Sequence, residues 1–126
     1  MREVLLDNSL ITIEKEGEII ITNLKATYVD LPTAKQAVKY RLDSTENNPY
    51  ILLSNIKQVK RCLYDARIFL ASAEGSERVL ICAVLIDSTI GAMIGNFFIR
   101  INKPIVPVKL FIDEGEAKTW LLNYKK

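Results

Sequence analysis

The segment from Val79 to Asp113 restricts the fold more than any other part of the chain. It begins with eight consecutive apolar residues, VLICAVLI, which is typical of a strand whose two faces are both covered. Asp87-Ser88 can cap a following helix, and Pro104 and Pro107 end that helix before a second apolar run, VKLFI. A buried strand, a helix and a second strand in this order predict an α/β domain with parallel strands.

The rest of the chain extends this pattern to one mixed β-sheet with helices packed on it, an α/β fold. Three short strands form a meander before Asp30, and apolar strands follow near residues 50–56, 79–86 and 108–112. Helices are predicted over residues 31–44, 63–76 and 88–102, with a last helix after Asp113. Because 126 residues suit one domain, we expect residues 1–126 to form a single unit.

The helix predicted over residues 31–44 carries a mostly apolar stripe that includes one charged residue. The members of the stripe recur at helical spacing and are Ala34, Ala37, Val38, Arg41 and Leu42. We expect this stripe to face the sheet.

The residue types that most enzymes use near neutral pH are missing. The chain contains no histidine, so it has neither a Ser-His-Asp triad nor a histidine metal ligand. It has no glycine-rich phosphate loop, and we expect its two cysteines, Cys62 and Cys82, to be buried, unreactive thiols. The sequence therefore predicts no catalytic residues, no metal and no cofactor, and a protein that is not an enzyme.

The charge pattern restricts the partners. The 17 basic and 15 acidic side chains are spread along the chain and leave a net charge of +2, which argues against nucleic acid as a partner. No signal peptide is recognisable at the N-terminus, and no apolar run reaches the roughly 20 residues that cross a bilayer. We expect a cytoplasmic protein without a transmembrane segment.

Several short segments in the second half of the chain are similar to those of a known family. They are LASAEG at residues 70–75 and DST, IGNFF, INKP and LF between residues 83 and 111. Through these segments and the order of its elements the chain resembles STAS domains. It most closely resembles a SpoIIAA-like (STAS/SEC14-like) group of uncharacterised bacterial proteins. The resemblance implies a STAS/SpoIIAA-like fold but assigns no activity.

The resemblance also allows a test for the phosphoserine switch that is usual in STAS domains. Anti-sigma-factor antagonists, which are STAS domains, carry a phosphorylatable serine at the start of the helix after the strand that matches residues 50–56. Residues 60–67, KRCLYDAR, match that place in this chain. No serine or threonine occurs between Asn55 and Ala71, so the usual phosphoserine switch is not expected here.

One polar cluster is a candidate anion or ligand site. Asp87, Ser88 and Thr89 follow a buried strand and begin a helix, and helix N-termini at such places commonly bind anions. The simpler interpretation is a helix cap, which contributes about 1 kcal/mol to stability. An active site built from Asp87 or Ser88 with Tyr64, Asp65 or Arg67 is a more distant alternative.

The helix predicted over residues 88–102 has more apolar residues than one contact with a sheet requires. Five of them are expected to face the sheet, namely Ile90, Met93, Ile94, Phe97 and Ile101. The outer face would then hold the predicted partner-binding residues, which are Gly91, Gly95, Phe98 and Ile99. Glycines inside a helix usually allow a close approach, either to the sheet or to a partner's backbone.

Two functions from different classes follow. The leading one is a non-catalytic, intracellular STAS-like module that binds itself, as a homodimer, or another protein through this helix. The alternative is a small-molecule or lipid-binding module of SEC14-like character. Its pocket would lie between the helix and the sheet and be lined by Met93, Phe97 and Phe111.

Overall fold

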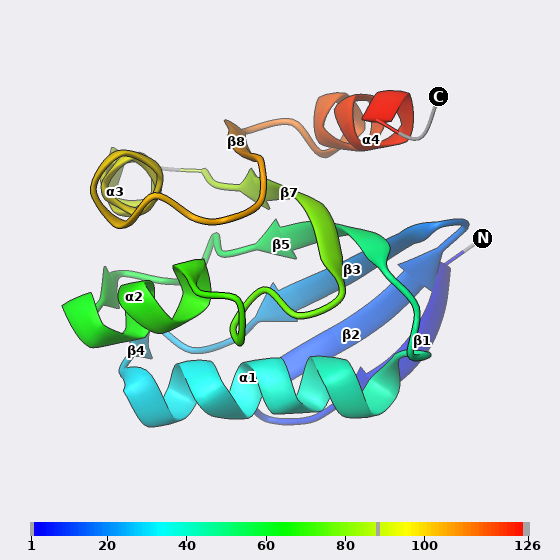
Figure 1. Cartoon of the computed structure of the whole chain (residues 1–126), viewed down its shortest axis with the longest axis horizontal. Coiled ribbons are helices and arrows are strands. Elements are labelled where there is room, and N and C mark those ends of the chain that lie inside the picture. The colour runs from blue at the N-terminus through cyan, green and yellow to red at the C-terminus, as the bar shows by residue number, and fades with distance from the viewer. Residues whose placement is uncertain (1, 88, 125–126) are drawn as a thin grey trace.

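The computed structural model, which describes residues 2–87 and 89–124, contains a six-stranded mixed sheet in the order β1-β2-β3-β5-β7-β8 (Figure 1). Its strands are β1 (Arg2–Asp7), β2 (Ile11–Glu16), β3 (Ile19–Leu24), β5 (Tyr50–Asn55), β7 (Val79–Leu85) and β8 (Val108–Phe111). The pairs β1–β2 and β2–β3 are antiparallel, and the later pairs are parallel. The predicted meander and its three parallel crossovers are confirmed.

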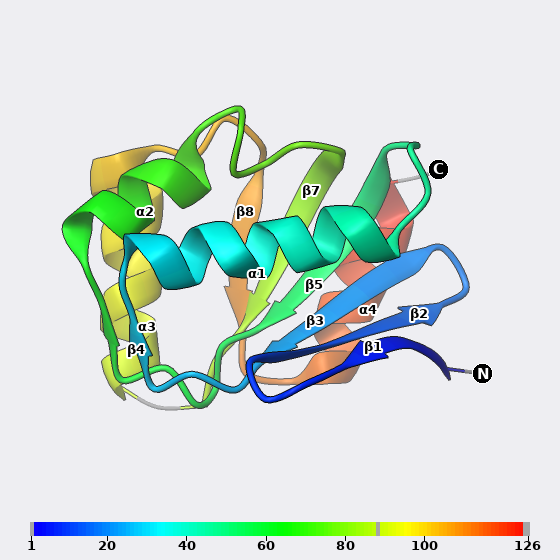
Figure 2. The same ribbon diagram turned by 90° about the horizontal axis from the view of Figure 1, so that it is seen from below.

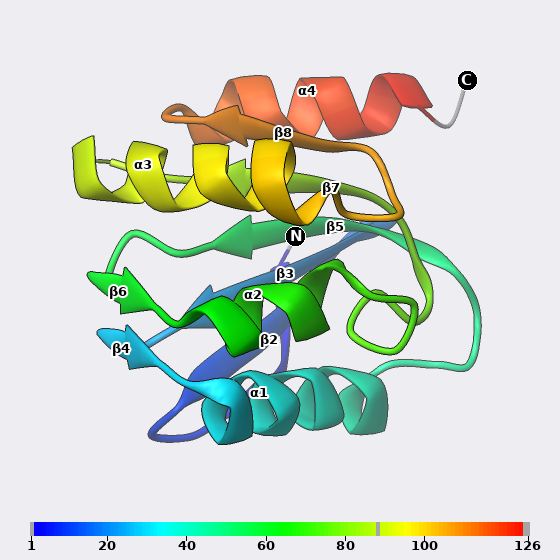
Figure 3. The same ribbon diagram turned by 60° about the vertical axis from the view of Figure 1, so that its left-hand side comes forward.

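The helices lie on both faces of this sheet. They are α1 (Leu31–Ser44), α2 (Tyr64–Ala71), α3 (Thr89–Phe97), which continues into the π-helix η1 (Phe98–Asn102), and α4 (Glu114–Tyr124). Figures 1 and 2 show α4 on one face and α1 and α2 on the other, with α3 beside α2 at the β8 edge. A short parallel ribbon of β4 (Tyr28–Val29) and β6 (Arg61–Cys62) lies near one end of the sheet (Figure 3). The prediction of one mixed sheet with helices packed on it is confirmed.

Each face of the sheet has its own apolar core, because successive residues of a strand point to opposite sides. The core between α4 and the sheet consists of Ile19, Ile21, Ile51, Leu53, Ile81, Ala83, Leu85, Ala117 and Leu121. On the face covered by α1 and α2, two clusters together contain Ile11, Ile13, Ile20, Val29, Ala34, Val38, Tyr50, Leu52, Val59, Ala66 and Phe69. The continuous apolar runs in the sequence thus correspond to strands covered on both faces.

The second helix ends earlier than predicted. The sequence predicts a helix over residues 63–76, whereas α2 ends at Ala71. The hydroxyl of Ser72 donates to the carbonyl oxygen of Phe69 at 2.5 Å, and that of Ser76 donates to the carbonyl oxygen of Leu70 at 3.1 Å. These side chains satisfy the last helix carbonyls and end the helix, which periodicity alone does not reveal.

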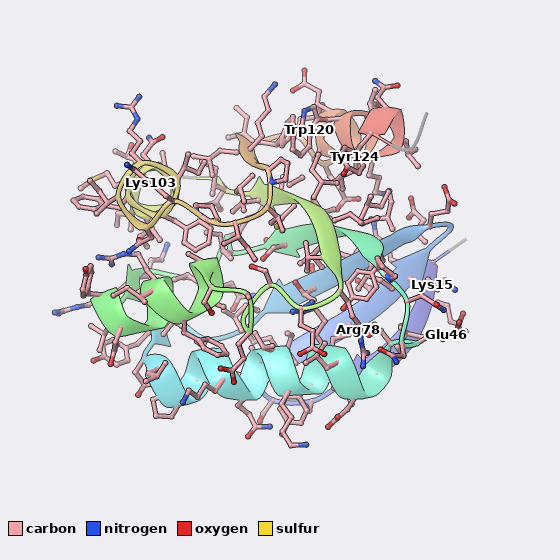
Figure 4. The ribbon with its side chains drawn as sticks, viewed as in Figure 1. Lys15, Glu46, Arg78, Lys103, Trp120 and Tyr124 are labelled. Carbon is pink, nitrogen blue, oxygen red and sulfur yellow. The ribbon has the colours of Figure 1, made fainter. Side chains whose placement is uncertain are left out.

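Arg78 joins the end of α1 to the start of β7. Its Nη1 donates to the carbonyl oxygens of Leu42 at 2.8 Å and Thr45 at 3.2 Å. Figure 4 shows it beside Glu46, whose carbonyl oxygen lies 3.4 Å from the same nitrogen. The guanidinium therefore neutralises the negative end of the helix dipole and satisfies carbonyls that have no partner within the helix.

Ion pairs fix α4 to the edge of the sheet. Lys118 Nζ lies 2.9 Å from a carboxylate oxygen of Glu16 and 2.9 Å from one of Glu114. Arg2 lies 2.7 Å from Glu114 and 3.3 Å from Glu16. Hydrogen bonds from Lys118, with a smaller contribution from Arg2, hold the pKa of both carboxyl groups below the ordinary glutamate value.

This network predicts a pH effect on stability. A carboxyl group whose pKa is lower in the folded protein stabilises the fold above its unfolded pKa, about 4.5, and the contribution is lost as pH falls through the folded pKa. Lys118→Met should therefore make the urea midpoint fall less steeply between pH 6 and pH 3. The matched control is Lys39→Met, which removes the exposed pair with Asp43. Parallel pH curves for the wild type and Lys118→Met would show that the network does not stabilise α4.

Candidate functional site

Helix α3 is rotated relative to the orientation predicted from the sequence. Gly91 and Gly95, predicted to lie on the outer face, are buried. Phe98 and Ile99, assigned to the same outer face, are half-buried. Four of the five residues predicted to face the sheet are instead exposed by 45–59%, namely Ile90, Met93, Phe97 and Ile101. The predicted orientation is wrong, although the excess of apolar surface on this helix is real.

The face of α3 that carries Gly91 and Gly95, here called the glycine face, explains the rotation. A Cβ atom at Gly95 would lie 2.5 Å from Leu110 Cδ2, so the absence of a side chain lets the helix backbone lie directly against β8. A larger residue would push the helix away or force Leu110 aside. Gly95 therefore serves the first of the two roles considered above, a close approach to the sheet.

The exposed residues form a continuous apolar surface, here called the outer stripe, which consists of Ile90, Met93, Phe97 and Ile101. Helix α2 extends it with Tyr64 and Ile68, which are 60% and 46% exposed. The guanidinium of Arg67 connects the two helices, since it lies 5.5 Å from the ring centroid of Phe97 and 5.8 Å from that of Tyr64. An apolar surface of this kind on a small domain is typical of an interaction site.

Beneath the same helix lies a cavity of about 170 Å³. It lies between the sheet and α1, α2 and α3, and its wall is mostly apolar. The side chains and backbone around it include Ala37, Val38, Arg41, Leu52, Ser54, Arg67, Leu70, Gly75, Ser76, Cys82, Val84, Ile94, Gly95, Phe98 and Val108. The place predicted for a pocket, between this helix and the sheet, therefore does hold one.

The lining residues differ from those predicted. Met93 and Phe97 face outward, whereas Ile94 and Phe98 line the cavity. Phe111 lies on the opposite face of the sheet, 5.5 Å from Trp120 of α4 between ring centroids. Two of these errors follow from the rotation of α3, and the third follows from the register of β8.

Arg41 is the most unusual residue in the cavity wall. Its side chain comes from the apolar stripe of α1, and the residue is only 4% exposed. Nη1 donates to the Tyr50 hydroxyl at 2.9 Å and to the Glu77 carbonyl oxygen at 3.1 Å, and Nη2 donates to the Gly75 carbonyl oxygen at 3.2 Å. The sequence analysis placed Arg41 on this stripe but assigned it no function. The feature that could have identified it is a single charged residue on an otherwise apolar helix face.

The two cysteines carry no negative charge that could balance Arg41. Burial raises the pKa of the Cys82 thiol to about 12, although Arg41 acts to lower it, and burial raises that of Cys62 to about 11. Both thiols are therefore protonated near neutral pH, which fits the prediction of unreactive cysteines, but both residues are half-buried and not fully buried as predicted. Among the described residues, no group of three or more cysteines and carboxylates could hold a metal ion.

The structure describes two of the three residues of the polar cluster after β7. Asp87 and Thr89 are exposed, and Ser88 lies outside the described residues. Neither Asp87 nor Thr89 lines the cavity. An anion site there stays a prediction.

The segment that replaces the STAS phosphoserine forms β6 and the first turn of α2. Helix α2 begins after Leu63, whose side chain offers no cap, and Tyr64 is exposed. Arg67 donates to the Cys62 carbonyl oxygen and to Asn102 Oδ1. This region therefore supports the outer stripe through Arg67 and contains no seryl acceptor.

Two comparisons with known proteins agree with this architecture. A family model described as "Domain of unknown function (DUF7793)" matches residues 11–125. The chain belongs to the DUF7793 family. The structure of this DUF7793 domain is also similar to the crystal structure of an uncharacterized DUF3478-family protein with a SpoIIAA-like fold from Shewanella loihica PV-4.

That similarity has a TM-score of 0.56 at 13% identity and covers 96% of this chain and 95% of the other. At such low identity it shows the fold alone, and the resemblance to SpoIIAA-like domains is thereby confirmed. No curated protein matches the sequence significantly. No helix in residues 2–87 or 89–124 is long and apolar enough to cross a membrane.

Proposed function

We propose that this DUF7793 domain is a single-domain, non-catalytic, cytoplasmic module that acts by forming a homodimer through the outer stripe. The observation that carries the proposal is the exposure of four large apolar side chains at helical spacing on α3 and η1. Helix α3 does not need them to pack on the sheet, because its glycine face already makes that contact. The proposed interface therefore lies on the helix predicted from the sequence, but on the side opposite to the predicted partner-binding residues.

The charges of this segment favour a second copy as the partner. Between residues 87 and 103 the charged residues are Asp87 before the helix and Arg100 and Lys103 near its end. A two-fold axis through the middle of the stripe would place two α3 helices antiparallel, so that the acidic end of each faces the basic end of the other. The same arrangement opposes the helix dipoles favourably.

The neighbouring helix would supply the remaining area. A stable dimer commonly buries about 800 Å² on each partner, which is more than one helical stripe provides. Tyr64 and Ile68 are exposed apolar residues of α2, and Arg67 lies against the rings of both Tyr64 and Phe97. Tyrosine and arginine are also enriched among the residues that dominate interface energies.

Substitution of Phe97 tests this function. We expect the wild type to sediment as a dimer, and Phe97→Asp should raise the dimer dissociation constant about 30-fold or more, because truncating a central interface residue typically has at least this effect. The fold should be retained, since Phe97 is 52% exposed. Analytical ultracentrifugation measures both masses, and Ile112→Asp, at a position 72% exposed outside the stripe, is the matched control.

A charge exchange tests the antiparallel arrangement. Arg100→Asp should weaken the dimer, and adding Asp87→Arg in the same chain should restore it. A monomeric wild type at about 100 μM protein, where even a weak specific complex forms, would contradict the proposal. So would a Phe97→Asp variant that sediments like the wild type.

The lipid-binding alternative has less support. Pockets for drug-sized ligands are typically about 300–1,000 Å³, and a lipid is larger than such ligands. The cavity beneath α3, at about 170 Å³, is too small for an acyl lipid. It remains large enough for a small molecule, which leads to a more specific proposal.

A further inference from the structure

We propose that the cavity beneath α3 binds a small monocarboxylate whose apolar body is about the size of one six-membered ring, with Arg41 as its anchor. This site is separate from the outer stripe, since the cavity lies under α3 and the stripe lies on its outer side. The inference does not depend on dimer formation.

The first argument is an uncompensated buried charge. Arg41 is 4% exposed and lines the cavity. The residues around the cavity include a second cation, Arg67, and no aspartate or glutamate. Among the described residues no carboxylate forms an ion pair with Arg41. Burying a charge without a counter-charge is strongly unfavourable, which makes an anionic ligand the expected complement.

The structural role of Arg41 does not remove this requirement. Its three hydrogen bonds, to Tyr50, Gly75 and Glu77, connect α1 with the loop before β7 and thereby stabilise the fold. The acceptors are a hydroxyl and two main-chain carbonyls, which are neutral and leave the positive charge in place. A guanidinium has five N–H groups, and the described hydrogen bonds of Arg41 use three of them. Carboxylates are the natural acceptors for such a group.

The second argument is size. An apolar protein cavity of about 150 Å³ is known to bind benzene. The cavity here, about 170 Å³, has room for a body of that size. A ring or a short branched chain carrying one carboxylate matches both the volume and the charge.

The third argument is polarity. Most of the wall is apolar, and apart from Arg41 and Arg67 its polar side chains, such as Ser54 and Ser76, are uncharged. A phosphate or a dicarboxylate would bring at least one more negative charge into a mostly apolar space. Arg67 is only half-buried, so water screens its charge and it needs no buried anion. The lining therefore favours one negative charge.

Binding of two matched probes tests the site. The first is 4-fluorobenzoate and the second is 4-fluorotoluene, which has similar size and no charge. Fluorine NMR should detect binding of both to the wild type at millimolar concentration or below. Arg41→Met retains much of the side-chain volume without the charge, so it should weaken 4-fluorobenzoate about 10-fold or more, the loss expected for a charged hydrogen-bonding partner. The Arg41→Met variant should bind 4-fluorotoluene at least as tightly as the wild type does.

Two further measurements cover the case in which Arg41→Met does not fold. In the wild type, 4-fluorobenzoate should bind at least about 10-fold more tightly than the neutral 4-fluorobenzamide. Ala37→Leu, which adds a larger side chain to the wall and leaves Arg41 in place, should abolish binding of both original probes. Failure of 4-fluorobenzoate to bind the wild type, equal binding of the benzoate and the benzamide, or unchanged binding to Ala37→Leu would overturn the proposal.

Discussion

Gly75→Ala is expected to lower the free energy of unfolding by about 2–3 kcal/mol, the upper part of the usual range for a substitution that overpacks a filled site. A Cβ atom at Gly75 would lie 2.1 Å from the Phe69 carbonyl oxygen and 2.8 Å from the Leu70 Cα. Both are main-chain atoms at the end of α2, so no side-chain rotation relieves the contact. The backbone of this turn must move, and the Arg41 hydrogen bond to the Gly75 carbonyl oxygen would be disturbed with it.

Thermal and urea unfolding measure this effect, and the loss corresponds to a decrease of roughly 10 °C in Tm for a domain of this size. Gly115→Ala in α4 is the matched control, because a Cβ atom there would make only ordinary contacts, the nearest at 3.6 Å from Asp113 Oδ1. Alanine is the better helix former, so this control should be neutral or stabilise by up to about 1 kcal/mol. If the two variants unfold alike, the close approach at Gly75 does not determine the turn.

Leu121→Ala is expected to lower the free energy of unfolding by about 3 kcal/mol, within the range observed for buried leucines. Leu121 is 0% exposed and is the main large side chain by which α4 enters the core formed with Ile51, Leu53 and Ile81. Because the core includes residues from three strands, the lost contacts cannot be replaced by a movement of α4 alone. The remaining cavity should therefore persist.

The neighbouring residue provides the control. Leu122 is 44% exposed and follows Leu121 directly, so Leu122→Ala makes the same chemical change on the other side of α4. We expect it to change the free energy of unfolding by less than about 1 kcal/mol, since little buried apolar area is lost. Equal destabilisation by the two substitutions, measured by urea unfolding, would mean that α4 is not docked through Leu121.

Helix α3 and η1 separate the two proposed sites. Gly95 and Phe98 border the cavity, whereas Phe97 and Ile101 belong to the outer stripe. The two surfaces can therefore be altered independently, by Ala37→Leu on the inside and Phe97→Asp on the outside. Each substitution should leave the other property unchanged.

The strands and α1 could be predicted closely because their residues follow simple periods. The apolar runs at 50–56 and 79–86 coincide with β5 and β7, and the stripe of Ala34, Val38 and Arg41 is buried as predicted. The orientation of α3 could not be predicted in this way. Its residues are apolar on nearly every side, so periodicity distinguishes no inward face. Only the position of Leu110 opposite Gly95 decides which face packs on the sheet.

The candidate sites were likewise predictable only in part from the sequence. The sequence indicated that α3 carries surplus apolar surface, but it assigned that surface to the glycine face. The sequence also indicated a pocket under α3. Of the residues predicted to line it, however, Met93 and Phe97 point to solvent and Phe111 lies on the other side of the sheet. The sequence placed Arg41 on an apolar stripe without showing whether that charge has a partner. Each of these points depends on which residues distant in sequence become neighbours.

The amino-acid sequence of this DUF7793 domain therefore determined the order of strands and helices, the mixed sheet and the absence of histidine chemistry, because these depend on residue type and local period. The tertiary structure decided the rotation of α3, the outer stripe and the burial of Arg41 beside an apolar cavity. Those features depend on packing between elements, where a single missing Cβ atom at Gly95 lets one helix face approach the sheet and leaves the other exposed.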